Sequence, residues 1–175
     1  MAVCLLDNDI LRSNFCGYSL KQITDIYLAN YEQVTGTTVQ DNEVATITMA
    51  GDAKFYHIEP AKDTATYEDS LQIGDGGSKY RQASISFNIG GAYNKDMVDV
   101  LDALSLGRYI AVAKFSDGTY VAFGRVVPME ASTASLSADA EATGFSGIQV
   151  TLEASTTEAP LPLSEAAIRT VLGQA

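Results

Sequence analysis

Apolar and polar side chains alternate most regularly over residues 80–89. The apolar members of this stretch are Ala83, Ile85, Phe87 and Ile89. A period of two predicts a strand with one buried face. From Asn94 the apolar spacing changes to three and four residues, which predicts a helix of about three turns. Asn94 is its expected N-cap, and Gly107 is expected to end it in a left-handed conformation.

A hairpin is expected directly after this helix. Residues 108–115 and 119–127 have strand character, and Asp117-Gly118 between them favours a two-residue turn. That turn would pair Phe115 with Tyr120. One face of the hairpin would then be a floor of small residues that the preceding helix could cover, namely Ala111, Ala113, Ala122 and Gly124.

The remaining elements follow from shorter patterns. Strands are expected at residues 23–31, 44–50, 54–59, 64–73 and 147–155, and the glycine-rich residues 74–78 should form a plain turn. This turn would join residues 64–73 and 79–89 as a hairpin. The polar side chains of the two strands would then lie beside each other: Thr66, Glu68, Ser70 and Gln72 on one strand, and Ser84, Ser86 and Asn88 on the other. Residues 128–143, rich in Ala, Ser and Thr, predict a long loop. Ser164 should cap a C-terminal helix over residues 165–172.

These elements define a mainly β (α+β) fold. We expect an antiparallel β-sandwich or partly closed barrel with one flanking helix and a short C-terminal helix. The predicted organisation is an N-terminal arm (residues 1–20), a single β-sandwich domain (residues 21–160), and a C-terminal connector and helix (residues 161–175).

Composition and charge exclude several classes of protein. The 175 residues carry a formal net charge of −11, and the Lys and Arg residues are scattered singly. This argues against a nucleic-acid-binding surface. No apolar run is long enough for a membrane helix, and no signal peptide is expected. Cys4 and Cys16 are expected to be two reduced thiols, with a disulfide between them as the alternative.

The sequence offers few groups for catalysis. His57 is the only histidine, and no Ser, Thr or Cys has an identifiable base partner. Glu59 and Asp63 near it have the spacing of neither a zinc nor a calcium site. The other candidate carboxylates are expected on solvated faces; they are Glu68, Asp69, Asp96, Asp99 and Asp102. We therefore predict no enzyme activity, no cofactor and no metal site.

The order of these features resembles the tail tube proteins of tailed bacteriophages. The likeness rests on residues 67–71, the glycine-rich turn, residues 80–87, the short helix, residues 107–112, Asp117-Gly118 and residues 147–154. Ring proteins of short tails are similar almost equally. The resemblance implies a virion protein, assembled in the host cytoplasm, that forms rings, usually hexameric. Stacked rings would form a tube through which the genome passes.

The resemblance also implies roles for particular segments. The hairpin of residues 64–89 would build the ring, while residues 1–20 and 128–143 would make the ring-to-ring contacts. Other tail proteins are further expected partners. The lumen would be lined by Thr66, Glu68, Ser70, Gln72, Ser84, Ser86 and Asn88. These side chains are neutral or acidic, as suits a channel along which DNA slides without specific binding. An ordinary solvated sheet face is the alternative.

Other classes of protein remain open at this point. A connector ring or the inner tube of an injection system would have the same sequence features. A β-sandwich module that binds a small ligand would normally expose aromatic side chains in a groove, and this chain has no Trp. Ring symmetry, host, sheath and the lumenal face are not determined by the sequence.

Overall fold

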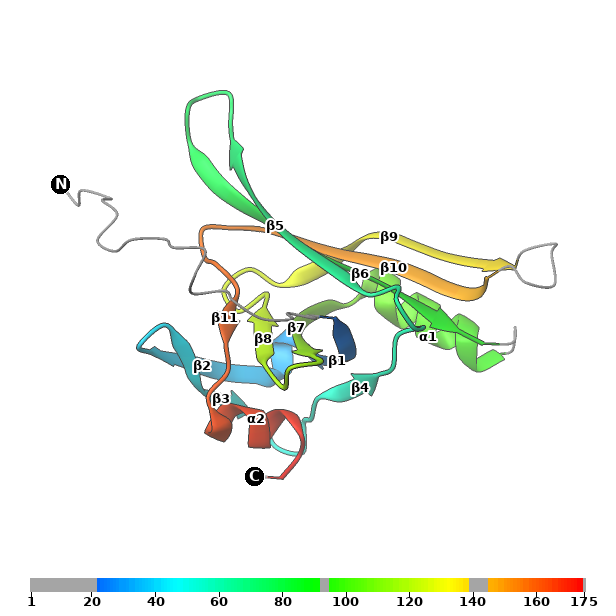
Figure 1. The fold of residues 1–175 in the computed structure, drawn as a ribbon, viewed down its shortest axis with the longest axis horizontal. Helices are drawn as coiled ribbons and strands as arrows, with labels where there is room; N and C mark the ends of the chain where they lie inside the picture. The colour runs from blue at the N-terminus through cyan, green and yellow to red at the C-terminus, as the bar shows by residue number, and fades with distance from the viewer. Residues whose placement is uncertain (1–21, 92–94, 139–144, 175) are drawn as a thin grey trace.

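The computed structural model describes residues 22–91, 95–138 and 145–174 (Figure 1). The predicted N-terminal arm, Cys4, Cys16 and the expected N-cap Asn94 lie outside the described residues. The described elements are β1 (Ile23–Asn30), the 3-10 turn η2 (Tyr31–Gln33), β2 (Val34–Gln40), β3 (Glu43–Met49), β4 (Tyr56–Ile58), β5 (Thr66–Ile73), β6 (Lys79–Gly90), α1 (Lys95–Leu106), β7 (Arg108–Phe115), β8 (Tyr120–Phe123), β9 (Met129–Ala138), β10 (Ser146–Thr156), β11 (Leu161–Pro162) and α2 (Glu165–Val171).

The fold is mainly β and antiparallel with two helices, as the sequence predicts. One sheet runs in the order β11-β8-β7-β9-β10-β6-β5; off this path, β1 pairs with β7 and β4 pairs with β1. Strand β7 meets β9 at only two residue pairs, Arg108 with Glu130 and Tyr109 with Met129. The sheet turns a corner there and folds over itself as a sandwich.

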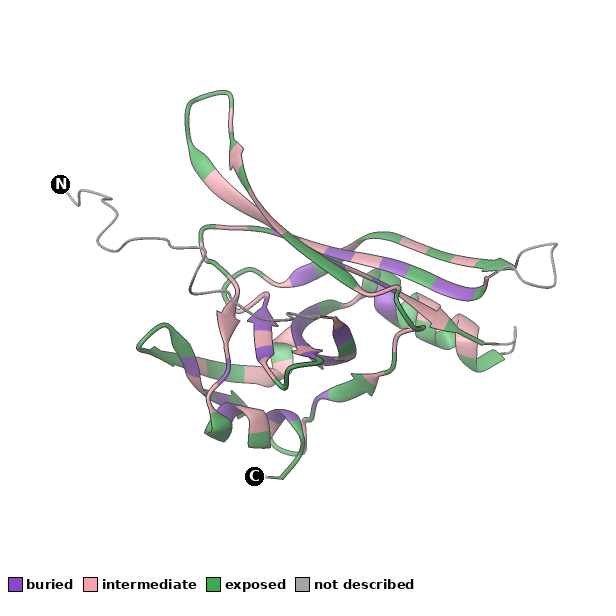
Figure 2. Ribbon diagram, in the orientation of Figure 1, coloured by how far each residue is buried: buried purple, intermediate pink, exposed green. Residues whose placement is uncertain are grey.

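The main core lies between the two halves of this sheet. One half, which we call the four-stranded layer, consists of β5, β6, β10 and β9; the other consists of β1, β7 and β8. Buried positions alternate along β6 and β10 (Figure 2), as predicted, and the largest fully buried side chains include Phe87, Ile85, Ile148 and Leu152. Helix α1 adds Leu104 to this core and packs mainly on β9.

A second, smaller core covers the opposite face of β1, β7 and β8. The β2–β3 hairpin and α2 close it, with Val44, Ile47, Ala167 and Val171 buried. Ser164 caps α2 as predicted, since its side chain accepts a hydrogen bond from the Ala167 amide at 3.3 Å. The C-terminal segment is therefore packed into the body of the protein.

The predicted register of the β7–β8 hairpin was wrong by one residue. Phe115 pairs with Thr119 through a 2.8 Å hydrogen bond, and Ala111 lies opposite Phe123. The loop has three residues and only Gly118 has a positive φ (84°), whereas a two-residue primed turn of type I′ needs two such residues. This shift places Ala122 on the second core and Ala111 and Ala113 on the main core.

The predicted helix-packing floor is therefore not a single surface. Ala111, Ala113 and Ala122 are fully buried, but β1, the opposite layer and the second core cover them. Gly124 lies beyond the end of β8 with φ 74°. Gly107 does end α1, but without the expected left-handed conformation. A side chain on residue 107 would collide with the Tyr109 ring, so packing requires a glycine here.

Two strands of seven or more residues were not predicted from the sequence. Residues 129–138 form β9, because a bulge at Ser132 interrupts the alternation and both halves still direct Ala131, Ala134 and Leu136 toward the core. Residues 34–40 form β2, and the β2–β3 turn has two left-handed residues, Asp41 (φ 52°) and Asn42 (φ 62°). The third predicted strand is shorter than expected and is β4.

Candidate functional surface

The residues predicted to line a lumen share one face of the four-stranded layer. Thr66 lies opposite Ser86 and Glu68 opposite Ser84 in the β5–β6 pairing, with Ser70 and Gln72 following at the same parity. Asn88 continues this face along β6. The buried residues of β6 point the other way, toward the main core. The face is thus the outer surface of the layer, and all seven side chains on it are exposed or half-buried.

The polar face extends across all four strands. On β10 it continues with Gln149, Thr151, Glu153 and Ser155, and on β9 with Glu130, Thr133, Ser135 and Ser137. The β9 members were missed because residues 128–143 were interpreted as a loop. A one-residue break in the alternation between Ala131 and Ala134 is the signal that could have revealed them.

Side-chain hydrogen bonds cross the face between β6 and β10. Ser86 and Thr151 hydroxyls lie 2.9 Å apart, Gln82 donates to Glu153 at 3.1 Å, and Ser155 donates to Gln82 at 2.8 Å. These bonds use part of the hydrogen-bonding capacity of the face internally.

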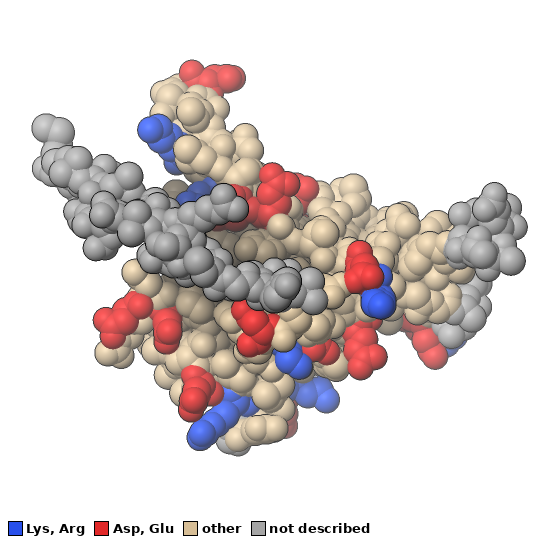
Figure 3. All heavy atoms as spheres, viewed as in Figure 1, with Lys and Arg blue, Asp and Glu red and all other residues tan. Residues whose placement is uncertain are grey.

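The charged groups on the face are all acidic. Within the four strands it carries Glu68, Glu130 and Glu153, which the pairings place in one row, and no Lys or Arg. The two cations of β6, Lys79 and Arg81, point to the opposite side, where Arg81 forms an ion pair with Asp69. Acidic side chains also spread over the view of the molecule in Figure 3.

Both lateral edges of the four-stranded layer are open in the described structure. Strand β5 ends the sheet order and pairs only with β6. Strand β9 pairs with β10 along its length, but with β7 only through Met129 and Glu130. Residues 131–138 of β9 thus leave their outer side without a strand. Open edges of this length are normally covered, charged or used for pairing with another chain.

The lone histidine belongs to a small polar cluster elsewhere, on β1, β4 and β7. His57 lies 2.8 Å from one Asp25 oxygen, and Lys114 lies 3.1 Å from the other. The His57 ring stacks on Tyr27, with ring centres 4.9 Å apart. Burial alone would raise the pKa of Asp25, but hydrogen bonds from His57, Thr24 and Lys114 outweigh it and lower this pKa below its usual value.

This cluster predicts a pH dependence of stability. Because the folded pKa of Asp25 is lowered, its stabilising effect should be present at neutral pH and lost as pH falls below about 4, toward the folded pKa. Asp25→Asn should therefore lower the free energy of unfolding at pH 7 and match the parent more closely at pH 3. Urea unfolding across this range measures the difference, with exposed Asp52→Asn as the control. A deficit of constant size at every pH would contradict the prediction.

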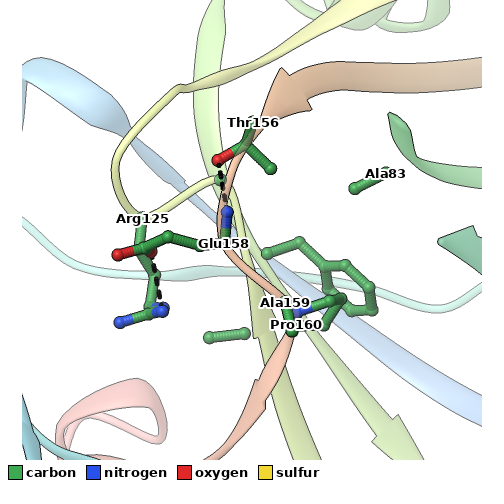
Figure 4. A pocket seen from close by; sticks show the side chains of 9 residues that line it. Ala83, Arg125, Thr156, Glu158, Ala159 and Pro160 are labelled. Carbon is green, nitrogen blue, oxygen red and sulfur yellow. Dashed lines mark hydrogen bonds and ion pairs between the residues drawn. The ribbon is translucent and has the colours of Figure 1, made fainter. Parts of the chain in front are cut away.

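The cavities of the described residues are small or shallow. The pocket in Figure 4 lies beside the Arg125–Glu158 ion pair (2.7 Å) and holds about 10 Å³, which is close to the lower limit for one water molecule. The wider hollows are open surface grooves, and one of about 570 Å³ lies beside β5. None of them has the enclosed, apolar form typical of a small-molecule site.

The other carboxylates considered in the sequence do not converge. Asp96, Asp99 and Asp102 are exposed on α1, and Glu68 and Asp69 point to opposite faces of β5. Among the described residues, no group of three or more His, Cys, Asp or Glu side chains is placed to bind a metal ion. None of the described helices has the length and apolarity needed to cross a membrane.

Comparison with known proteins adds no relative. No family model matches the chain, and no curated protein or solved structure matches it. Any function proposed for the chain therefore rests on its own geometry and on its sequence resemblance to tail tube proteins.

Proposed function

We propose that this protein is the structural subunit of a virion tail tube: copies of the chain form rings, and stacked rings form a channel for DNA. The observation that carries the proposal is the four-stranded layer with two open edges and a polar outer face. The subunit's partners would be copies of itself, other tail proteins and the DNA that passes through without specific binding. No catalytic step is part of this role.

Strand direction in the layer supports cyclic assembly. The order β5, β6, β10, β9 is antiparallel at every step. Strands β5 and β9 therefore run in opposite directions, so β5 of one copy would be antiparallel to β9 of the next. A ring of identical copies would continue the alternation at each junction and leave no edge unpaired.

The stagger of the layer also suits a closed barrel. Strand β5 lies opposite residues 79–86 of β6, whereas β10 connects residues 131–137 of β9 to residues 85–90. The two edges are offset by about five residues. With the junction to the next copy included, one copy contributes four strand spacings to the barrel, so this offset corresponds to a strand tilt of roughly 40°. This value lies within the range of closed barrels.

The dimensions and charge of such a barrel fit DNA passage. Six copies, the number that the resemblance implies, would give a barrel roughly 45–50 Å across between opposite backbones, before side chains are added. Placed inside, the polar face would present glutamates, amides and hydroxyls to the DNA. Phosphates would find no Lys or Arg on this face of the four strands to displace their counterions, so the DNA would not be held.

Negative-stain electron microscopy of the purified protein across a concentration series tests the proposal. Rings or tubes with a central hole are expected at high concentration. Their symmetry would distinguish a hexameric tube from a connector ring, the alternative within this class. Small monodisperse particles at every concentration would contradict the proposal and favour a binding module.

A further inference from the structure

The β5–β6 hairpin extends beyond the layer beneath it (Figure 1). Tyr67 still packs on Phe115 and Phe123 of the body, with ring centres 5.6 and 5.5 Å away. Further along the same side of β5, Leu71 is 61% exposed and Ile73 is 66% exposed. We call the surface of Tyr67, Leu71 and Ile73 the hairpin underside. An overhang with three large exposed hydrophobic side chains indicates a contact that a single copy does not make.

Helix α1 occupies the corresponding position under the other edge of the layer. It packs on the core side of β9, the strand with the second open edge. Its exposed surface combines two apolar side chains, Val100 (41% exposed) and Leu106 (86% exposed), with the aspartates of the helix. The hairpin underside and α1 thus lie on the same side of the layer, at opposite edges.

We infer that in the ring the hairpin underside of one copy docks on α1 of the neighbouring copy. This inference rests on the proposed function, because pairing of β5 with the neighbour's β9 is what brings the two surfaces together. Both surfaces lie on the core side of the layer, so the pairing would place α1 directly beneath the overhang. The groove of about 570 Å³ between β5 and the segment around Pro160 and Pro162 would open toward the helix.

Charge complementarity supports this choice of partner. The underside carries two cations, Lys79 and Arg81, and one carboxylate, Asp69. The helix carries three aspartates and only one cation, Lys95. Lys79, which lies opposite Ile73, is exposed and is therefore the cation available to pair with an aspartate of the neighbouring copy. Opposite net charges on two facing surfaces favour the intended register and disfavour others.

The strand directions predict which residues meet. Antiparallel pairing would place Ile73, the last residue of β5, near residue 131 at the start of the open part of β9. Helix α1 also ends at this position, because the β7 residues that follow it pair with Met129 and Glu130. The C-terminal residue of the helix, Leu106, should therefore contact Ile73 of the neighbouring copy.

Cysteine cross-linking between differently tagged chains tests this contact. Ile73→Cys and Leu106→Cys are made in separate chains that also carry Cys4→Ser and Cys16→Ser, and the chains are mixed, assembled and treated with a short bis-maleimide. A heterodimer is expected to form in the assembled state and to be lost after dilution to monomers. The matched control replaces Leu106→Cys with Val39→Cys, an exposed position on β2.

Charge reversal gives a second, independent readout. Lys79→Asp and Asp102→Lys should each raise the concentration needed for assembly, by about tenfold, and the double variant should recover part of the loss. Rings that form while Ile73→Cys cross-links no better to Leu106→Cys than to Val39→Cys would overturn the docking inference and leave the proposed function standing. A parent protein that forms no rings at any concentration would overturn both.

Discussion

A proline that removes an edge-facing amide of β5 is expected to stop ring formation while leaving the subunit folded. Successive amides of a strand point alternately to its two sides, so one of Ser70→Pro and Leu71→Pro removes a hydrogen bond to β6 and the other removes a donor on the open edge. The variant that loses the hydrogen bond to β6 should destabilise the hairpin by about 3 kcal/mol. The variant that loses only the donor on the open edge should leave the monomer's free energy of unfolding nearly unchanged.

The concentration needed for ring formation distinguishes the edge-facing proline variant from its control. The edge-facing proline should raise the concentration for ring formation by at least about tenfold. It deletes a backbone hydrogen bond to the next copy, and its pyrrolidine group lies where that copy would pair. Ser70→Ala and Leu71→Ala keep the amide and serve as controls. Urea unfolding identifies which proline variant is folded, and electron microscopy measures assembly. If the folded proline variant forms rings as readily as its alanine control, β5 is not the assembly edge.

If the polar face lines the proposed channel, lysines on this face are expected to convert it from a surface that does not bind DNA into one that holds DNA. Ser84→Lys with Ser86→Lys would add two cations per copy to a face that has none on its four strands. A ring would then displace many counterions from a threaded duplex. Affinity for duplex DNA at low salt should increase by at least about a hundredfold, with a steep dependence on salt concentration.

A matched pair of lysines elsewhere controls for net charge. Thr46→Lys with Thr48→Lys places the same charges at the same spacing on β3, where both threonines are exposed and outside the four-stranded layer. Both variants should form rings, but only the Ser84/Ser86 variant should retain DNA, and a phage carrying it should lose infectivity. Equal DNA binding by the two variants, or normal infectivity with a lysine-lined tube, would show that this face is not lumenal.

The sequence predicted the inner strands of the sandwich well. In β6 and β10 nearly every buried position alternates with a polar one, so periodicity alone identified both the strand and its core face. Ser164 before an apolar stripe likewise marked the start of α2, and Gly173 (φ 68°) its end. In each case the signal is local, since it depends on neighbouring residues of one element.

Errors arose where a single residue changed the register. One extra residue at Ser132 concealed β9, and one extra loop residue after Phe115 moved Ala122 to the opposite core. Both changes leave composition almost unaffected, so the sequence signal is weak. The candidate surface was affected in the same way: its β5 and β6 members were predicted, while its β9 members, which include Glu130, were not.

The amino-acid sequence by itself determined the fold class, the alternating faces of the long strands and the absence of basic residues from their polar sides, because these depend on side-chain type and spacing. Only the tertiary structure decided which strands end the layer and where α1 packs. Those features depend on pairing between segments far apart in the chain, such as β6 with β10 and α1 with β9. The open edges and the overhanging hairpin, on which the assembly proposal rests, come from these long-range pairings.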